Sequence, residues 1–343
     1  MRRETPAVIC LLLVVALSPL AFSGCGPEDE MAGGTPSAAA RTTEEAPNAE
    51  QPNVAEAAAD SIDESSIRAH LAHLTGASPA PLEGDATTIS ERGSAEGRRT
   101  TAEYLEESFE EMGIQARTLE FSVDDRRGYN VEAILRGSGG GRHLWVTAHL
   151  DSTYNPGAND NASGLVSMLM TAQALERLDL EHTVHFVAYD LEEIGAIGSS
   201  RYVEDVLGDV IERKGGGAII GNLNNDMVGY DKSGREAVMG TCNQAGPLDD
   251  ALLRASEILD SQISLSDVCL GRSDHQNFWD AGLPAMVLTD GSMYDGYPWY
   301  HEPEDTLDKL DLGYLRSMIQ LTAATAALLA APRGEGTRPP ANG

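Results

Sequence analysis

Residues 144–164, LWVTAHLDSTYNPGANDNASG, give the clearest indication of the fold of this chain. It begins with an apolar run typical of a buried strand, residues 144–150, and turns polar at Asp151. A loop containing Pro, Gly and Asn follows, and Ser163 begins a long apolar segment with helical spacing. A buried strand, a loop and a helix in this order form the repeating unit of an α/β protein. The stretch therefore predicts a largely parallel sheet covered by helices.

The rest of the chain continues this alternation. Short apolar runs bounded by Gly, Asp, Asn or Pro are typical of strands, and apolar residues three and four positions apart are typical of helices. Strands are predicted at residues 129–135, 144–150, 183–189, 218–223, 237–240 and 285–289, and helices at residues 64–74, 95–112, 163–178, 199–206, 247–259, 274–281 and 312–329. We expect one α/β domain with a mixed, mainly parallel central sheet and helices on both faces.

The charge balance argues against one class of function. The chain has 343 residues, with 24 Lys+Arg against 54 Asp+Glu and a formal net charge of −30. Proteins that bind nucleic acids carry basic surfaces, so a nucleic-acid partner is not expected. The acidic excess is compatible with bound metal cations. Because 41% of the residues are apolar, the chain can still bury a large core.

The first residues have the pattern of an export signal. A short basic start precedes an apolar run, residues 7–17, which is shorter than the roughly 20 residues of a membrane-spanning helix. Residues 20–25, LAFSGC, resemble a bacterial lipobox, in which the cysteine is lipidated and becomes the mature N-terminus. We expect a signal peptide over residues 1–24 and a lipid on Cys25 that anchors the protein to the cell envelope. Ordinary cleavage and secretion is the alternative.

The composition changes again after the predicted lipobox. Residues 25–62 are acidic and rich in Ala, Pro, Thr and Glu, so they are expected to form a disordered tether. The folded domain is expected over residues 63–332, followed by a disordered tail at residues 333–343. Within the domain, Cys242 and Cys269 could pair in an oxidising compartment, a question that the sequence leaves open.

The polar residues that follow the predicted strands carry the chemistry. In an open α/β sheet, ligands bind at the carboxyl ends of the strands. Four such ends offer a histidine or a carboxylate, in residues 149–160, 190–193, 225–226 and 299–301. Two histidines and three carboxylates suit a pair of divalent cations, since zinc takes both ligand types and one carboxylate can bridge two metals. The residue types therefore predict a dizinc centre.

Six motifs stand in a fixed order along residues 129–329. They are His149-Leu150-Asp151, Asp160-Asn161-Ala162-Ser163-Gly164, Glu192-Glu193 with Gly198-Ser199, Asn225-Asp226, Ser273-Asp274-His275-Gln276-Asn277-Phe278, and His301 with Asp305-Thr306. This order resembles that of the co-catalytic dizinc exopeptidases of the bacterial leucyl aminopeptidase type, whose relatives include glutamate carboxypeptidase and glutaminyl cyclase. The resemblance covers nearly the whole predicted domain and implies a zinc exopeptidase fold with two zinc ions per chain.

The resemblance implies a ligand set for these two ions. Asp160 would bridge them. His149 and Asp226 would complete the first site, and Glu193 and His301 would complete the second. The peptide bond after Asp160 is expected to be cis, as is frequent in the family.

The resemblance also implies catalytic roles. Glu192 would be the general base that activates the zinc-bridging water and returns the proton to the leaving amine. Asp151 would orient the imidazole of His149. Arg272 and Tyr300 would hold the developing oxyanion or the substrate backbone.

Several activities remain open on this pattern. An aminopeptidase that removes N-terminal residues from peptides is the leading expectation. A carboxypeptidase or a glutaminyl cyclase would use the same fold, and a chain without catalysis could serve as a surface binding module. The complete set of motif residues argues against the last alternative. The preferred substrate side chain and the oligomeric state cannot be derived from the sequence.

Overall fold

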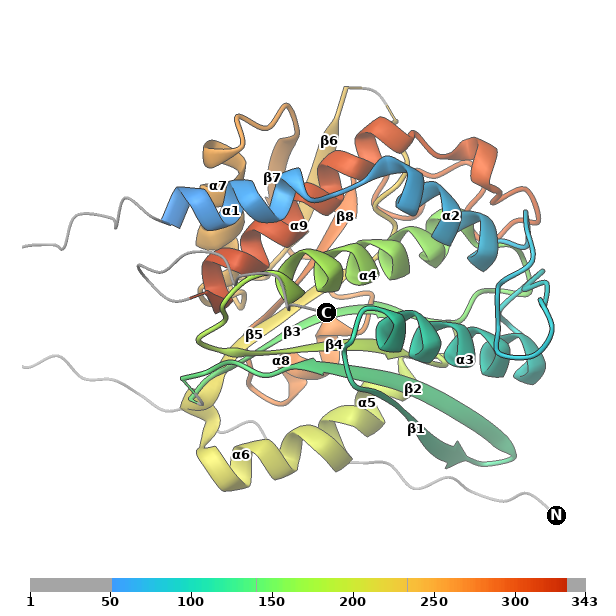
Figure 1. Cartoon of the computed structure of the whole chain (residues 1–343), viewed down its shortest axis with the longest axis horizontal. Coiled ribbons are helices and arrows are strands. Elements are labelled where there is room, and N and C mark those ends of the chain that lie inside the picture. The colour runs from blue at the N-terminus through green and yellow to red at the C-terminus, as the bar shows by residue number, and fades with distance from the viewer. Residues whose placement is uncertain (1–50, 140, 233, 332–343) are drawn as a thin grey trace, which may run out of the picture. The chain divides into compact units, whose positions relative to one another are not determined.

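An eight-stranded sheet forms the centre of the folded part (Figure 1). It is seen in a computed structural model, which describes residues 51–331 without residues 140 and 233. The strands are β1 (Ala116–Val123), β2 (Arg126–Leu135), β3 (His143–His149), β4 (Thr183–Tyr189), β5 (Ile219–Asn225), β6 (Glu236–Gly240), β7 (Ser264–Val268) and β8 (Ala285–Asp290). Their order in the sheet is β1-β2-β4-β3-β5-β8-β6-β7.

The middle of the sheet is parallel and its flanks are mixed. Strands β4, β3, β5 and β8 are parallel neighbours. The pairs β1·β2, β2·β4 and β6·β8 are antiparallel, and β7 is parallel to β6. Every residue of β3 and β4 is buried, as expected for strands covered on both faces. The mixed, mainly parallel sheet confirms the predicted fold class.

Helices cover both faces of the sheet (Figure 1). On one face lie α1 (Gln51–Asp60), α2 (Glu64–Leu74), α3 (Ala95–Glu111), α4 (Ser163–Glu176), α7 (Leu248–Ile258) and α9 (Leu312–Ala330), and on the other lie α5 (Ile197–Tyr202), α6 (Gly208–Lys214) and α8 (His275–Asp280). Short π- and 3₁₀-helical turns are η1 (Ala158–Ala162), η2 (Val203–Leu207), η3 (Gly216–Ala218) and η4 (Leu307–Lys309). Each face of the sheet packs against its helices through an apolar cluster: the first cluster lies under α1, α2, α3, α4, α7 and α9, and the second lies under α5, α6 and α8. Successive side chains of a strand point to opposite faces, so Val146 of β3 belongs to the first cluster and Trp145 to the second.

Capping residues explain where two predicted helices begin and end. The side chain of Asp63 accepts a hydrogen bond from the backbone N–H of Ser66 at the start of α2. Ser94 does the same for Gly97 at the start of α3. Gly113 follows α3 with φ of 79°, a left-handed conformation that glycine adopts without strain and that commonly ends a helix.

Two strands and one predicted helix differ from the prediction. Strands β1 and β7 lie at the two edges of the sheet, where half of the hydrogen-bonding groups have no neighbour and few residues are buried. Their sequences therefore lack an apolar run. The helix predicted to end at residue 206 continues through η2 into α6, because Val210 and Ile211 pack against the second cluster.

The prediction of a disordered tether is wrong for its last part. Residues 51–60 form α1, and the side chains of Val54, Ala55 and Ala58 are buried. Helix α1 packs on α9, which is itself rich in alanine. Small side chains let the two helices approach closely, so α1 is buried without any large apolar residue. The alanine-rich composition that suggested disorder also favours a helix, because alanine has the highest helix propensity.

The predicted export features lie outside the described residues. These are the signal peptide at residues 1–24, Cys25, the tether as far as residue 50 and the tail at residues 333–343. Within the described part of the chain, no helix combines the length and apolarity that crossing a membrane requires.

Cys242 and Cys269, which the sequence left open, form a disulfide bond. Cys242 follows β6 and Cys269 follows β7. The two strands pair in parallel, so their carboxyl ends lie side by side and the disulfide joins them.

Candidate metal centre

The five predicted metal ligands meet at the carboxyl edge of the parallel strands. His149 ends β3, Glu193 follows β4, Asp226 follows β5 and His301 lies in the loop after β8. Asp160 lies in η1, between β3 and α4. Ligand atoms of His149, Asp160 and Asp226 lie within 4.8 Å of one another, and so do those of Asp160, Glu193 and His301. The structure thus forms two groups that share Asp160.

The separations between ligand atoms fit zinc. Nε2 of His149 lies 3.1 Å from Oδ1 of Asp160 and 3.4 Å from Oδ1 of Asp226. Nε2 of His301 lies 3.2 Å from Oδ2 of Asp160 and 3.0 Å from Oε2 of Glu193. Two atoms bound to one tetrahedral zinc at normal bond lengths lie about 3.3 Å apart. Asp160 presents one oxygen to each histidine, the arrangement of a bridging ligand.

Several buried oxygens of this cluster lack a hydrogen bond. Asp160 Oδ2, Asp226 Oδ1 and Glu193 Oε1 are buried and, among the residues that the structure describes, accept none. Buried carboxylates are normally hydrogen-bonded or paired, because an uncompensated buried charge costs several kcal/mol. Two cations held by these atoms would compensate all three, so the donor set fits a pair of divalent metals.

The crowded charges alter the protonation of the centre. Burial, with the charge of Asp160 adding to it, raises the pKa of Glu193 to about 7. Burial alone would lower the pKa of His301, but the neighbouring carboxylates of Asp160 and Glu193 raise it to about 10. Without cations, the centre therefore retains protons at neutral pH. Metal binding must release them.

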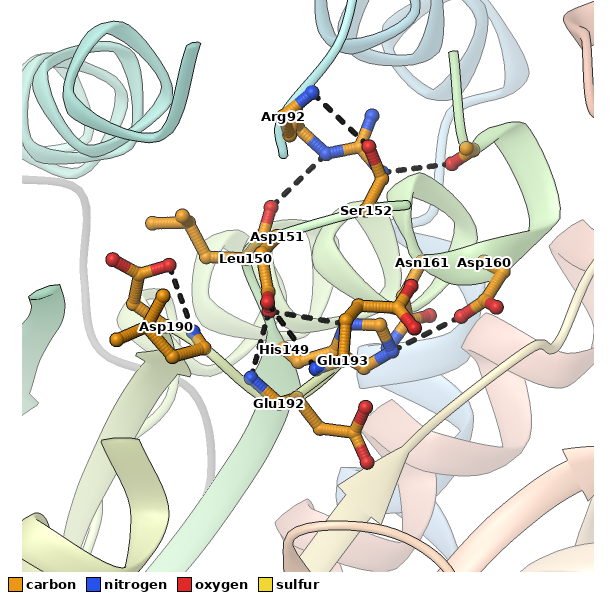
Figure 2. Close-up of polar contacts among 12 residues, drawn as sticks. Arg92, His149, Leu150, Asp151, Ser152, Asp160, Asn161, Asp190, Glu192 and Glu193 are labelled. Carbon is orange, nitrogen blue, oxygen red and sulfur yellow. Dashed lines mark hydrogen bonds and ion pairs between the residues drawn. The ribbon is translucent and has the colours of Figure 1, made fainter. Parts of the chain in front are cut away.

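Asp151 connects His149 to the Glu192-Glu193 doublet (Figure 2). Its Oδ1 lies 3.6 Å from Nδ1 of His149. Its carboxylate also accepts hydrogen bonds from the backbone N–H groups of Glu192, at 3.0 Å, and Glu193, at 3.2 Å. The structure places Asp151 beside the imidazole, where the sequence predicted it. The contact with the doublet was not foreseen.

Glu192 is partly buried and lies next to the ligands. In Figure 2 the carboxylates of Glu192 and Glu193 point in different directions, and that of Glu193 lies towards His149 and Asp160. Burial raises the pKa of Glu192 well above its ordinary range, against the charge of His149, which lowers it. A carboxylate with a raised pKa accepts a proton readily, as a general base must.

The segment that carries Asp160 is held by a second carboxylate. Asp305 accepts hydrogen bonds from the backbone N–H groups of Asn159, at 2.8 Å, and Asp160, at 3.0 Å. The hydroxyl of Tyr297 donates to the same carboxylate at 2.7 Å. Asp305 was noted as part of a motif, but no role was assigned to it.

The residue after Asp160 ties this segment to the neighbouring strand. The peptide bond between Asp160 and Asn161 is cis, as predicted. The side chain of Asn161 donates to the carbonyl of Asn225 at 2.9 Å and accepts from the N–H of Gly164 at 2.9 Å. A Cβ at Gly164 would lie 2.4 Å from the carbonyl oxygen of Asn225, so this contact needs glycine.

The two residues predicted to hold the oxyanion lie in different surroundings. The ring of Tyr300 stacks on that of His301, with centroids 3.8 Å apart. Burial and then the charge of Asp160 raise the pKa of Tyr300. Arg272 donates to Asp295 at 2.9 Å and lies over the ring of Tyr294, 5.4 Å from its centroid. The structure brings Tyr300 to the ligands and engages Arg272 with Asp295.

Sequence reasoning missed a second tyrosine at the centre. The side chain of Tyr294 is buried, and its hydroxyl has no hydrogen-bond partner within the described part of the chain. Burial and then the charges of Asp226 and Glu192 raise its pKa well above the ordinary value. One tyrosine in a loop carries no positional signal in the sequence.

The other motif histidine has a structural position. Nε2 of His275 lies 2.8 Å from the carbonyl oxygen of Leu270, and the side chain is buried. Its neighbour Asp274 does not cap α8 but accepts a hydrogen bond from the hydroxyl of Ser199 at 2.5 Å. Both residues hold the loops around the centre together.

Comparison with known sequences gives one family and several relatives. The profile of peptidase family M28 matches residues 130–326. Aminopeptidase YwaD of Bacillus subtilis is 33% identical over 186 residues, which are 53% of this chain and 40% of that protein. Leupeptin-inactivating enzyme 1 of Streptomyces exfoliatus is 30% identical over 201 residues, 58% of this chain and 44% of that protein. The chain thus matches about two fifths of the length of these curated relatives.

Solved structures of low sequence identity share the fold. The zinc aminopeptidase BSAP from Bacillus subtilis has a TM-score of 0.69 at 17% identity and covers 80% of this chain and 97% of its own. The aminopeptidase LapA of Legionella pneumophila has a TM-score of 0.70 at 20% identity, with coverages of 88% and 80%. Glutaminyl cyclase of Porphyromonas gingivalis has a TM-score of 0.61 at 17% identity, with coverages of 77% and 97%.

Proposed function

Since the chain belongs to peptidase family M28, we propose that it is a zinc-dependent aminopeptidase, which removes N-terminal residues from peptides. The observation that carries the proposal is the convergence of two groups of ligand atoms on the shared carboxylate of Asp160. Relatives named as aminopeptidases give it further support.

The proposed ligand set uses every residue of the two groups. His149, Asp160 and Asp226 would hold one zinc ion. Asp160, Glu193 and His301 would hold the other. When bound, a pair of zinc ions supplies Lewis-acid polarisation of the scissile carbonyl and lowers the pKa of water at the site.

Glu192 is the proposed general base. Its carboxylate takes a proton from the attacking water and returns it to the nitrogen of the leaving amine. Its raised pKa favours uptake of the proton. The hydrogen bond from its backbone N–H to Asp151 keeps it adjacent to His149 and Glu193.

Tyr300 is the proposed donor to the oxyanion. Its ring stacks on that of His301, and burial together with the nearby charge of Asp160 raises the pKa of its hydroxyl. A phenol that donates a hydrogen bond to the developing negative charge lowers the barrier of the step. Arg272 is proposed to bind the substrate backbone beside it, for which it must leave Asp295.

The mouth of the site offers apolar contacts. Tyr154, Ile194 and Met293 are large apolar side chains that are more than two fifths exposed, at 71%, 44% and 41%. Each lies in a loop after one of the parallel strands β3, β4 or β8, at the edge of the sheet that carries the ligands. We propose peptides with apolar residues near the N-terminus as substrates.

We propose that the protein is exported and anchored by a lipid on Cys25. The lipobox at residues 20–25 supports this, and so does a relative named as a probable lipoprotein aminopeptidase, LpqL of Mycobacterium tuberculosis, 30% identical over 226 residues. Cys25→Ser is expected to move the protein from the membrane fraction to the soluble fraction. Unchanged fractionation of this variant would contradict the anchor.

The decisive experiment combines metal analysis with a substrate panel. Purified protein is expected to contain two zinc ions per chain and to release the chromophore from amino-acyl amides with a free amine. Blocking that amine by acetylation should abolish release. Removal of C-terminal residues instead would indicate a carboxypeptidase, and cyclisation of N-terminal glutamine with one zinc ion would indicate a glutaminyl cyclase. Full zinc occupancy without turnover would indicate a binding module.

A further inference from the structure

Arg92 lies behind the metal centre, and its side chain has no access to solvent. It precedes α3, far along the chain from every predicted ligand. Its guanidinium donates four hydrogen bonds, and all four go to backbone carbonyls: Nε to Leu150 at 3.0 Å, Nη1 to Leu74 at 2.8 Å and to Pro156 at 2.6 Å, and Nη2 to Gly157 at 2.8 Å.

Three of these acceptors lie at the two ends of one loop, and the fourth, Leu74, is the last residue of α2. Leu150 precedes the loop that links β3 to η1, and Pro156 and Gly157 end it. This loop separates His149 from Asp160 along the chain. One side chain, that of Arg92, therefore holds the two ends of the loop together.

The backbone of Arg92 is also attached to this loop. Its N–H donates to Oγ of Ser152 at 3.0 Å, and its carbonyl accepts from the N–H of Ser152 at 3.3 Å (Figure 2). At the other end, a Cβ on Gly157 would lie 2.6 Å from Nη2 of Arg92. The loop fits the arginine closely, since that glycine has no side chain and has φ of 56°.

The charge of Arg92 has no direct counter-ion. In the part of the chain that the structure describes, no carboxylate accepts a hydrogen bond from its guanidinium. Arg98, another buried arginine, pairs with Asp190 at 3.0 Å. Burying a cation without such a partner costs several kcal/mol. A neutral donor could bind carbonyls at lower cost, so the positive charge itself needs an explanation.

The negative charges that compensate the buried charge of Arg92 belong to the metal centre and do not bind its guanidinium directly. Burial lowers the pKa of Arg92, and the carboxylates of Asp305, Asp160 and Asp151 raise it, in that order. Asp160 is the shared ligand, and the other two carboxylates hold the backbones of ligand segments. Arg92 thus adds a buried positive charge close to the carboxylates of the centre.

We propose that Arg92 is a positioning residue of the metal centre, which sets the spacing between His149 and Asp160 and offsets the carboxylates around the shared ligand. It touches neither the substrate nor the metals in this proposal. The inference rests on the proposed function, because it assumes a centre that binds two cations.

The test measures metal binding rather than turnover. Full-length protein, purified in detergent and stripped of metal, is titrated with Co²⁺, and the visible absorption spectrum is recorded. Affinity for Zn²⁺ is measured by competition with a chromophoric chelator. Arg92→Met removes the charge and the donors, and Arg92→Lys keeps the charge but loses the planar fork. Arg117→Met is the matched control, since Arg117 is half-exposed and pairs with Glu132, outside the centre.

Arg92→Met is expected to lower the affinity for Zn²⁺ about 10- to 100-fold and to change the Co²⁺ spectrum. Arg92→Lys should lose less affinity than Arg92→Met, and Arg117→Met should bind both metals as the wild type does. If Arg92→Met changes only the melting temperature, with wild-type affinity and spectrum, Arg92 is merely structural and the proposal is overturned.

Two further outcomes also bear on the proposal. If circular dichroism shows that Arg92→Met does not fold, the proposal depends on Arg92→Lys, and wild-type metal affinity and spectrum in that variant overturn it. Failure of the wild type to bind either metal overturns the proposed function itself. Wild-type binding with unaffected variants overturns only the role of Arg92.

Discussion

The carboxylate of Asp151 accepts a hydrogen bond from the backbone N–H of Glu192 at 3.0 Å. Asp151 follows β3 and Glu192 follows β4, so the bond joins the ends of two neighbouring parallel strands. Since Asp151 also lies beside His149, the proposed base and a proposed ligand share one support. The position of the proposed base is thus coupled to that of the proposed ligand His149.

Glu192→Gln should separate chemistry from metal binding. The amide is nearly isosteric with the carboxylate, and the supporting bond comes from the backbone, so both zinc ions should remain bound. Because an amide cannot accept the proton of the attacking water, kcat is expected to fall about 10²- to 10⁴-fold. Zinc content and kcat are measured on the same preparation. Glu204→Gln, a change on an exposed glutamate, is the control, and kcat near wild type in Glu192→Gln would remove the base from its role.

Asp160→Asn should affect both metal sites, whereas Asp226→Asn should affect one. Asp160 belongs to both groups of ligand atoms and Asp226 to only one. Replacing a charged oxygen by an amide weakens zinc binding at each site that uses it. We expect less than one zinc ion per chain in Asp160→Asn and close to one in Asp226→Asn, measured by elemental analysis after gel filtration. Equal zinc contents in the two variants would contradict a shared ligand.

The grouping of the candidate ligands was predictable because each lies at or beyond the carboxyl end of a buried strand. The apolar runs of β3, β4, β5 and β8 indicate where the strands end, and parallel strands bring those ends to one edge. His149, Glu193 and Asp226 could therefore be placed together from sequence. The order of the motifs then gave the resemblance that assigned their roles.

The residues that hold the candidate ligands in place were not predictable from the sequence. Arg92 lies in a polar segment with no periodic pattern, and its partners are backbone carbonyls, which have no sequence signature. Asp305 and Tyr294 reach the centre through loops whose course depends on tertiary packing. Helix α1 was missed for a related reason, since alanine signals neither burial nor exposure until its partner helix is known.

Loss of the disulfide should destabilise the folded domain. Cys242 and Cys269 are separated by 27 positions. Closing a loop of this length lowers the entropy of the unfolded chain and raises its free energy by about 3–4 kcal/mol. The double variant with serine at both positions is expected to have a lower free energy of unfolding by up to this amount, measured by urea denaturation. Wild-type protein treated with a reductant should match the variant, and the reductant should have no effect on the variant itself. A double variant as stable as the oxidised wild type would contradict the prediction.

Acidification should destabilise the protein in part through His70 on α2. Nδ1 of this residue lies 2.7 Å from the hydroxyl of Tyr104, and burial, with the charge of His73 adding to it, lowers its pKa to about 4. An unfolded histidine titrates near 6.5, so the unfolded chain binds more protons between pH 6.5 and 4. The contribution of His70 is therefore complete above pH 6.5 and declines as the pH falls towards 4. The total loss is at most about 3 kcal/mol.

His70→Gln removes this titration, so its free energy of unfolding should fall less than that of the wild type when the pH is lowered through this window. Urea denaturation at a series of pH values measures the difference. Arg68→Gln, an exposed change on the same helix, should follow the wild type. If His70→Gln and the wild type lose the same stability on acidification, His70 is protonated as easily in the folded protein as in the unfolded chain. Its burial against Tyr104 would then have no part in the acid sensitivity.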